Sequence, residues 1–122
     1  MVMGVFSIEI EVSAGQQRSE RVEALVDTGA TNTVLPADLL QRLGVQAYKK
    51  STFQLADGRE LELDIGRVWV QVDGQREFTQ VVFGESGMGP ILGAVTLEEM
   101  ALAVDPVGKR LVPVNKYLLA AV

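Results

Sequence analysis

Apolar and polar residues alternate along several short segments of this chain, and that pattern predicts a protein built mainly of β-strands. Residues 6–12 read Phe-Ser-Ile-Glu-Ile-Glu-Val, so every second side chain is apolar. Side chains that alternate in this way point to opposite faces of a sheet, one toward a core and one toward solvent. Similar segments, rich in β-branched and aromatic residues, predict strands at residues 21–26, 33–35, 51–55, 60–65, 67–72 and 77–83.

Turn-forming residues separate these segments and indicate which strands pair. Asp57-Gly58 and Asp73-Gly74 each lie between two alternating segments, which is a strong signal for a β-hairpin. Residues 14–17 and 104–111 predict two further hairpin connections. Gly66 falls between two of the predicted strands, where a glycine marks a bulge or a bend.

Two short helices interrupt the strand pattern. Pro36 suits the first position of a helix over residues 36–43, whose leucines share one face and which a glycine follows. Thr96 and Glu99 have the spacing of a capping box, in which the hydroxyl residue precedes the helix and the acid lies three residues later. That pair predicts a second helix that runs to about Leu102.

Length and charge bound the class of protein. The 122 residues suit a single domain, residues 1–122, with an all-β fold and one or two short helices. Eleven Lys and Arg against 16 Asp and Glu give a net charge of −5, and no basic run follows the chain, so nucleic acid is not an expected partner. No apolar run is long enough to span a bilayer, so we expect no membrane segment and a cytoplasmic location.

The chain contains no cysteine and no histidine. Their absence excludes disulfides, thiol nucleophiles, Ser-His-Asp triads and nearly all zinc or haem sites. We therefore expect a function that needs no metal and no cofactor.

Asp27-Thr28-Gly29-Ala30 is the stretch with the clearest chemical character. It follows the apolar run at residues 24–26, which places an acid at the end of a buried strand. Gly29 permits a sharp turn that leaves the Asp27 carboxylate at the mouth of a cleft, and the Thr28 hydroxyl can hold that turn by a local hydrogen bond.

This stretch, with the segments around it, resembles the retropepsin-like aspartic proteases, the single-domain class of the pepsin clan. Asp27 to Ala30 and residues 33–35 match the catalytic loop of that family, and Ile91-Leu92-Gly93 matches its second signature. The resemblance implies a closed barrel in which Ile91, Leu92 and Gly93 support the loop from beneath. It also implies that the hairpin tipped by Ala56, Asp57, Gly58 and Arg59 is a flap, and that this tip, Thr31 and Asn32 contact substrate.

The same resemblance implies an aspartic endopeptidase that acts on polypeptides as a homodimer. One chain carries one such loop, so a two-fold axis would bring two Asp27 residues together. Two close carboxylates share a proton; the ionised one takes a proton from water while the protonated one polarises the scissile carbonyl. The apolar tail at residues 117–122 is costly to leave in water, which also favours a second copy.

Two positions depart from the retroviral members of this family. Those enzymes carry an acid where this chain has Thr31 and an arginine where it has Ala94, and the two residues pair with each other. Loss of both avoids an unpaired buried charge but removes one support of the site. The rival reading is therefore a catalytically silent module of the same fold that serves in dimerisation or peptide binding.

A third reading, a glycosidase with two carboxylates in one chain, needs a second placed acid. The candidates Asp64, Asp73, Glu85 and Asp105 are more simply turn or surface residues, as is Asp57 in the flap tip. For the remaining notable side chains, we expect Trp69 and Phe83 in the core and Glu98 and Glu99 in solvent at the start of a helix.

Overall fold

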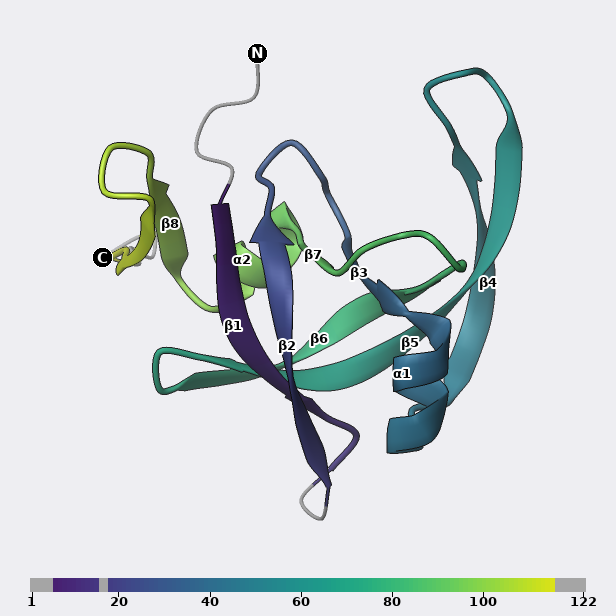
Figure 1. Ribbon diagram of the computed structural model, residues 1–122, viewed down its shortest axis with the longest axis horizontal. Coiled ribbons are helices and arrows are strands. Elements are labelled where there is room, and N and C mark those ends of the chain that lie inside the picture. Colours follow the sequence, from purple (N-terminus) through teal and green to yellow (C-terminus); the bar gives the residue numbers. More distant parts are fainter. Residues whose placement is uncertain (1–5, 16–17, 116–122) are drawn as a thin grey trace, which may run out of the picture.

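Strands dominate the fold, as the alternating pattern predicts. The computed structural model describes residues 6–15 and 18–115 (Figure 1). In chain order these residues form β1 (Phe6–Ser13), β2 (Ser19–Val26), β3 (Thr33–Pro36), α1 (Ala37–Leu43), β4 (Ala47–Gln54), β5 (Glu60–Val72), β6 (Gln75–Gly84), β7 (Ile91–Leu92), α2 (Ala94–Glu99), β8 (Leu102–Asp105) and β9 (Arg110–Pro113).

Six strands close into a barrel. Neighbouring strands follow the order β1-β2-β7-β3-β6-β5, and residues 11–13 of β1 pair with residues 69–71 of β5 to close the ring. The β2–β7 and β3–β6 pairs are parallel, and the other pairs in the ring are antiparallel. β4 pairs with β5 outside the ring, and β8 and β9 form a separate two-stranded sheet. The predicted all-β closed barrel with short helices is confirmed.

Alternate aliphatic side chains from every strand of the ring fill its interior. Val12, Val26, Leu35, Val70 and Leu92 are fully buried there. Each such side chain stabilises the fold by roughly 1.5–3 kcal/mol relative to exposure. The leucines of α1, which share one face as predicted, pack onto the same core: Leu39, Leu40 and Leu43. Leu97 of α2 and Met100, which follows that helix, also pack there. The barrel is thus rigid directly beneath the loop that follows β2.

Gly66 marks an irregularity of the sheet, as predicted, but the strand that carries it does not end there. β5 runs without a break through the two segments predicted as separate strands. Ala47 of β4 pairs with Gly66 and Lys49 pairs with Ile65, so the extra residue lies on β4. A β-carbon at Gly66 would lie 2.9 Å from the backbone oxygen of Gln46 and 3.0 Å from the Phe83 ring. The glycine therefore permits a close approach of neighbouring segments, and no bend is required.

The first helix begins one residue later than predicted. Pro36 is the last residue of β3 and precedes α1, with extended backbone angles of φ −57° and ψ 135°. Gly44 ends the helix with φ 85°, and its N–H donates to the carbonyl of Gln41 at 3.0 Å. A left-handed conformation of this kind favours glycine at the end of a helix.

The capping box predicted for the second helix is wrong. Gly93 precedes α2 without a side-chain cap, and Thr96 and Glu99 both lie inside the helix. The helix ends at Glu99, and Leu102 already begins β8. The Thr96 side chain is buried and bonds to Thr33 of a distant strand, so a tertiary contact uses the hydroxyl that the sequence assigned to a local cap.

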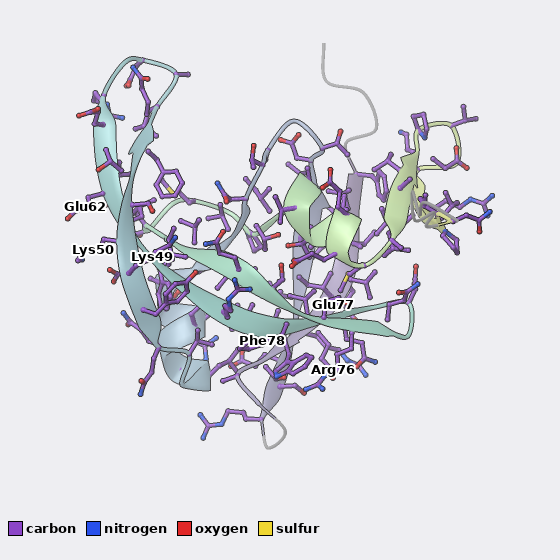
Figure 2. The ribbon with its side chains drawn as sticks, turned by 180° about the vertical axis from the view of Figure 1, so that it is seen from behind. Lys49, Lys50, Glu62, Arg76, Glu77 and Phe78 are labelled. Atoms are coloured by element: carbon purple, nitrogen blue, oxygen red, sulfur yellow. The ribbon has the colours of Figure 1, made fainter. Side chains whose placement is uncertain are left out.

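The two aromatic residues predicted for the core behave differently. Phe83 is buried, as predicted. Trp69 is only half-buried: its ring centroid lies 5.0 Å from that of Phe78 across the β5–β6 ladder, and the Arg76 guanidinium lies 4.0 Å above its ring. Arg76 and Phe78 lie together on this hairpin (Figure 2). The prediction for Trp69 fails because the alternation within β5 places this side chain on the outer face.

The hairpin predicted at residues 104–111 is confirmed as β8–β9. The predicted loop at residues 14–17 lies partly outside the described residues, and the apolar tail at residues 117–122 lies wholly outside them. Within residues 6–15 and 18–115, neither helix has the length and apolar character needed to cross a membrane.

Candidate active site

Asp27 directly follows β2, where the chain leaves the barrel core. The side chain is half-buried, and its Oδ1 accepts a hydrogen bond from the Gly29 N–H at 2.9 Å. The Ala30 N–H donates to the Asp27 carbonyl at 3.1 Å and closes a tight turn. The carboxylate is thus fixed by its own loop with one oxygen bound to the backbone. Thr28, expected to hold the turn by its hydroxyl, is exposed and makes no side-chain hydrogen bond within the described residues.

β7 lies between the strand that enters this loop and the strand that leaves it. Ile91 pairs with Leu25 of β2 and with Val34 of β3, and the Leu92 carbonyl accepts the Asp27 N–H at 3.1 Å. Leu92 itself is fully buried. The structure therefore brings Ile91 and Leu92 together with the Asp27 loop, although more than sixty residues separate them in sequence.

Gly93 allows α2 to approach the loop closely. A β-carbon there would lie 2.5 Å from both the carbonyl carbon and the oxygen of Asn32 and 2.9 Å from the Thr33 nitrogen. Immediately after it, the Ala94 N–H donates to the Ala30 carbonyl at 2.8 Å. A side chain at position 93 would displace backbone, so the requirement for glycine is steric.

The positions that depart from the retroviral pattern remain connected, by backbone atoms. Thr31 is exposed, and its carbonyl accepts the Val95 N–H at 3.1 Å. With the Ala94–Ala30 bond, this makes two hydrogen bonds from the first turn of α2 to the loop. These bonds link the helix to the loop without a charged side chain at position 31 or 94.

A buried cluster of hydroxyl groups beneath the loop was missed by the sequence analysis. Thr33, Thr79 and Thr96 are each at most 1% exposed. The Thr96 Oγ1 lies 2.6 Å from that of Thr33 and 2.9 Å from that of Thr79, and Thr79 donates to Glu99 at 2.6 Å. Glu98 is exposed as expected, whereas Glu99 is half-buried, so the expectation of a solvated Glu99 is wrong.

The hairpin assigned to the flap is the β4–β5 pair, which projects from the barrel (Figure 1). The Asp57 carboxylate accepts the Arg59 N–H at 3.0 Å and the Arg59 Nε at 2.7 Å. These backbone and side-chain hydrogen bonds from Arg59 hold the pKa of Asp57 below its ordinary value. Gly58, with φ 89°, completes the turn. The interpretation of Asp57 as a turn residue is confirmed.

Little of this hairpin is buried. The first four residues of β4, Lys49 and Lys50 among them, are exposed, and so is Glu62 of this hairpin (Figure 2). Lys50 pairs with Asp64 at 2.9 Å, and the hydrogen bond to that carboxylate raises the pKa of Lys50. Within the described chain, no hydrogen bond or ion pair joins residues 56–59 to residues 27–32. The structure therefore leaves the tip residues apart from the Asp27 loop.

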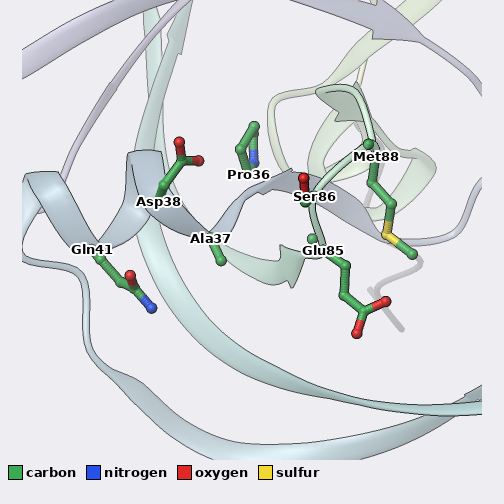
Figure 3. A pocket seen from close by; sticks show the side chains of 9 residues that line it. Pro36, Ala37, Asp38, Gln41, Glu85, Ser86 and Met88 are labelled. Atoms are coloured by element: carbon green, nitrogen blue, oxygen red, sulfur yellow. The ribbon is translucent and has the colours of Figure 1, made fainter.

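A pocket of about 610 Å³ lies between the start of α1 and the loop that follows β6 (Figure 3). The sequence analysis gave no signal for it. The side chains around it are mostly small or polar, with two acids, Asp38 and Glu85, and one methionine, Met88.

The other candidate acids are turn or surface residues, as interpreted. Asp64 pairs with Lys50, and Asp73 occupies the β5–β6 turn with φ 50°. Asp105 accepts hydrogen bonds from the Val107 and Gly108 N–H groups, and the Gly108 contact contributes most to its lowered pKa. Glu85 is exposed in the loop after β6. Among the described residues, no three acids cluster closely enough to hold a metal ion.

Comparison with known proteins agrees with this geometry. A family model described as aspartyl protease matches residues 9–101. No match was found among curated proteins.

Three solved structures share the fold. The simian foamy virus (mac) protease is 18% identical with a TM-score of 0.58, over 76% of this chain and 92% of that one. The EIAV protease, solved with the inhibitor HBY-793, is 20% identical with a TM-score of 0.59, over 78% of this chain and 86% of that one. A retropepsin-like aspartic protease from Rickettsia conorii is 19% identical with a TM-score of 0.52, over 85% of this chain and 82% of that one. The chain belongs to the aspartyl protease family, and its fold is the retropepsin-like one.

Proposed function

We propose that this chain is an aspartic endopeptidase that cleaves polypeptides as a homodimer, with one Asp27 from each copy. The observation that carries the proposal is the fixed Asp27 carboxylate, bound by the Gly29 N–H and supported from beneath by Leu92. A carboxylate held in one orientation at the end of a core strand is suited to general acid and base catalysis.

A second copy is needed because the sequence contains a single Asp-Thr-Gly triplet. A two-fold axis through the loop would place two Asp27 carboxylates side by side. Like charges at short range cannot both ionise easily, so the pair retains one proton. The exposed Thr28 and Thr31 lie in the same loop, where a second copy or a bound peptide would contact them.

Each residue then has a defined role in peptide hydrolysis. The ionised Asp27 takes a proton from a water molecule, whose oxygen bonds to the scissile carbonyl carbon, while the protonated Asp27 gives its proton to the carbonyl oxygen. When the C–N bond breaks, the leaving nitrogen takes up the proton that the first Asp27 holds, and one hydroxyl of the tetrahedral intermediate returns its proton to the other Asp27, so the pair again holds one proton. Gly29, Ala30 and residues 91–93 hold the loop. Asn32 and residues 56–59 contact the peptide.

The reaction uses no metal and no cofactor, and the unit that carries it out is the single domain predicted for residues 1–122. A cytoplasmic location remains a prediction from the sequence. The catalytically silent module remains the rival, because Thr31 and Ala94 replace the charged pair of the retroviral enzymes.

Substitution of the catalytic acid separates these two functions. Asp27→Asn preserves size and the oxygen that accepts from Gly29, but it removes the proton-sharing acid. We expect peptide cleavage to fall by at least about 1,000-fold while sedimentation still shows a dimer. The matched control is Asp73→Asn, because asparagine tolerates the turn conformation that Asp73 adopts. Cleavage by Asp27→Asn at the wild-type rate would exclude the proposed mechanism. If the wild-type protein forms a dimer that cleaves no member of any peptide library, the silent module is favoured.

A further inference from the structure

Four side chains form a continuous hydrogen-bonded chain beneath the Asp27 loop. It runs from Thr33 on β3 through Thr96 on α2 and Thr79 on β6 to Glu99 at the end of α2. The three hydroxyl groups are almost completely buried, whereas Glu99 is half-buried at the surface end. This hydroxyl chain therefore runs from the support of the site to the edge of the protein.

The two ends of this chain fix the direction of every hydrogen bond in it. A threonine hydroxyl has one proton to donate. Thr79 gives its proton to the Glu99 carboxylate, so Thr96 must donate to Thr79, and Thr33 must in turn donate to Thr96. Thr33 is then left with its oxygen free to accept, and the Gly93 N–H donates to it at 3.0 Å.

Gly93 is the point at which this chain meets the catalytic loop. The preceding residue, Leu92, accepts the Asp27 N–H, and the following residue, Ala94, donates to the Ala30 carbonyl. The hydroxyl chain consequently ends between two of the backbone hydrogen bonds that tie the loop to its support.

We propose that Glu99 is a positioning residue for the Asp27 loop, acting through Thr79, Thr96 and Thr33 on Gly93. As far as it concerns catalysis, this inference rests on the proposed function. Without an acceptor at position 99, the three hydroxyl protons have only two acceptors among themselves, so one proton is left over whichever way the bonds point. When the hydroxyl chain reverses, that proton is the one on Thr33, beside Gly93. An unsatisfied buried donor is costly, so the defect loosens the loop at a distance from the substituted residue.

Three variants of α2 test this chain. Glu99→Leu removes the acceptor, Glu99→Gln keeps an oxygen that can accept from Thr79, and Glu98→Leu makes the same change at the exposed neighbouring acid. In Glu99→Leu we expect amide exchange at Gly93 and Ala94 to rise about 10-fold more than exchange in the β5–β6 ladder. In Glu99→Gln and Glu98→Leu, amide exchange at Gly93 and Ala94 should change no more than exchange in the β5–β6 ladder, because the direction of the hydroxyl hydrogen bonds is unchanged.

Glu99→Asp serves if the leucine variant does not fold. It keeps the charge but is one methylene shorter, so it reaches Thr79 poorly. We expect it to loosen Gly93 while Glu99→Gln does not. If instead Glu99→Asp keeps the Gly93 amide protected and Glu99→Gln does not, the charge at position 99 matters and the hydroxyl chain does not. That result would overturn the proposal.

Catalysis provides the last readout. Well below the melting temperature, Glu99→Leu should lower kcat several-fold and leave KM unchanged, because the loop is loosened and peptide contacts are not altered. Equal kcat for wild type and Glu99→Leu, with exchange changed as expected, would remove the catalytic part of the inference. If wild type cleaves no peptide, the proposed function fails, while the exchange measurements still decide whether the hydroxyl chain exists.

Discussion

Replacement of Gly93 by alanine is the change to which the support of the site is most sensitive. The added β-carbon would lie 2.5 Å from the carbonyl carbon and oxygen of Asn32, where carbon atoms normally approach to about 3.5–4.0 Å. Both partners are backbone atoms, so no rotamer change can relieve the contact. Either β7 and α2 or the Asp27 loop must move by about 1 Å.

The free energy of unfolding should fall accordingly. Overpacking in a tight core costs about 1–3 kcal/mol. The displacement also weakens the bonds from Gly93 to the Thr33 hydroxyl and from Ala94 to Ala30, worth about 1 kcal/mol each. We therefore expect a loss of about 3 kcal/mol, which corresponds to a drop in Tm of roughly 12 °C for a domain of this size.

Gly89→Ala is the matched control. Gly89 lies four residues earlier, and a β-carbon there meets no atom within 4 Å. Its Tm should change by less than about 4 °C, and a small rise is consistent with the account because alanine restricts the unfolded chain. Both variants are measured by calorimetry at one protomer concentration, since association shifts Tm. A Gly93→Ala variant that melts within 2 °C of Gly89→Ala, as a rough limit, would refute the steric account of the glycine.

Three further outcomes are expected. Amides of residues 52–64 should exchange at least about 10-fold faster than those of β2, because the flap hairpin is mostly exposed; equal protection would contradict its assignment as a mobile flap. The folded pKa of Asp57 lies below its ordinary value of 3.8, so this carboxylate stabilises the hairpin tip above that pH and loses the contribution as pH falls through the folded pKa. A protection factor of the Arg59 amide, relative to the unfolded chain at each pH, that stays constant down to about pH 2 would argue against this. Gly44→Ala should cost about 1 kcal/mol because of its left-handed backbone, and chemical denaturation should detect no such loss for Gly44→Asn.

The strands and their hairpins followed from the sequence because local rules decide them. Alternation along residues 6–12 and the Asp-Gly pairs at both hairpins act between near neighbours, and the structure has β1, β4–β5 and β5–β6 there. Gly66 indicated the irregularity, but the sequence could not show that the extra residue lies on β4. The close approach of Gln46 and Phe83 to this glycine is likewise known only from the fold.

The support of the candidate site was predictable only in part. The resemblance indicated that residues 91–93 lie beneath the Asp27 loop, and the structure has them there. The threonine cluster was not predictable, since its members lie 17 and 63 residues apart and threonine in a strand is usual. Thr96 and Glu99 matched a capping box by spacing, but a buried tertiary partner outcompeted the local cap.

The most direct test of a shared active site is a mixing experiment. Wild type and Asp27→Asn, refolded together in equal amounts, should assort at random, so about one quarter of the dimers carry two aspartates. The account predicts peptidase activity of about one quarter of that given by wild type alone at the same total protomer concentration, because a dimer of one wild-type and one Asp27→Asn protomer lacks the proton-sharing pair. Activity of about one half, in proportion to the wild-type chains present, would mean that each chain acts alone and would contradict the account.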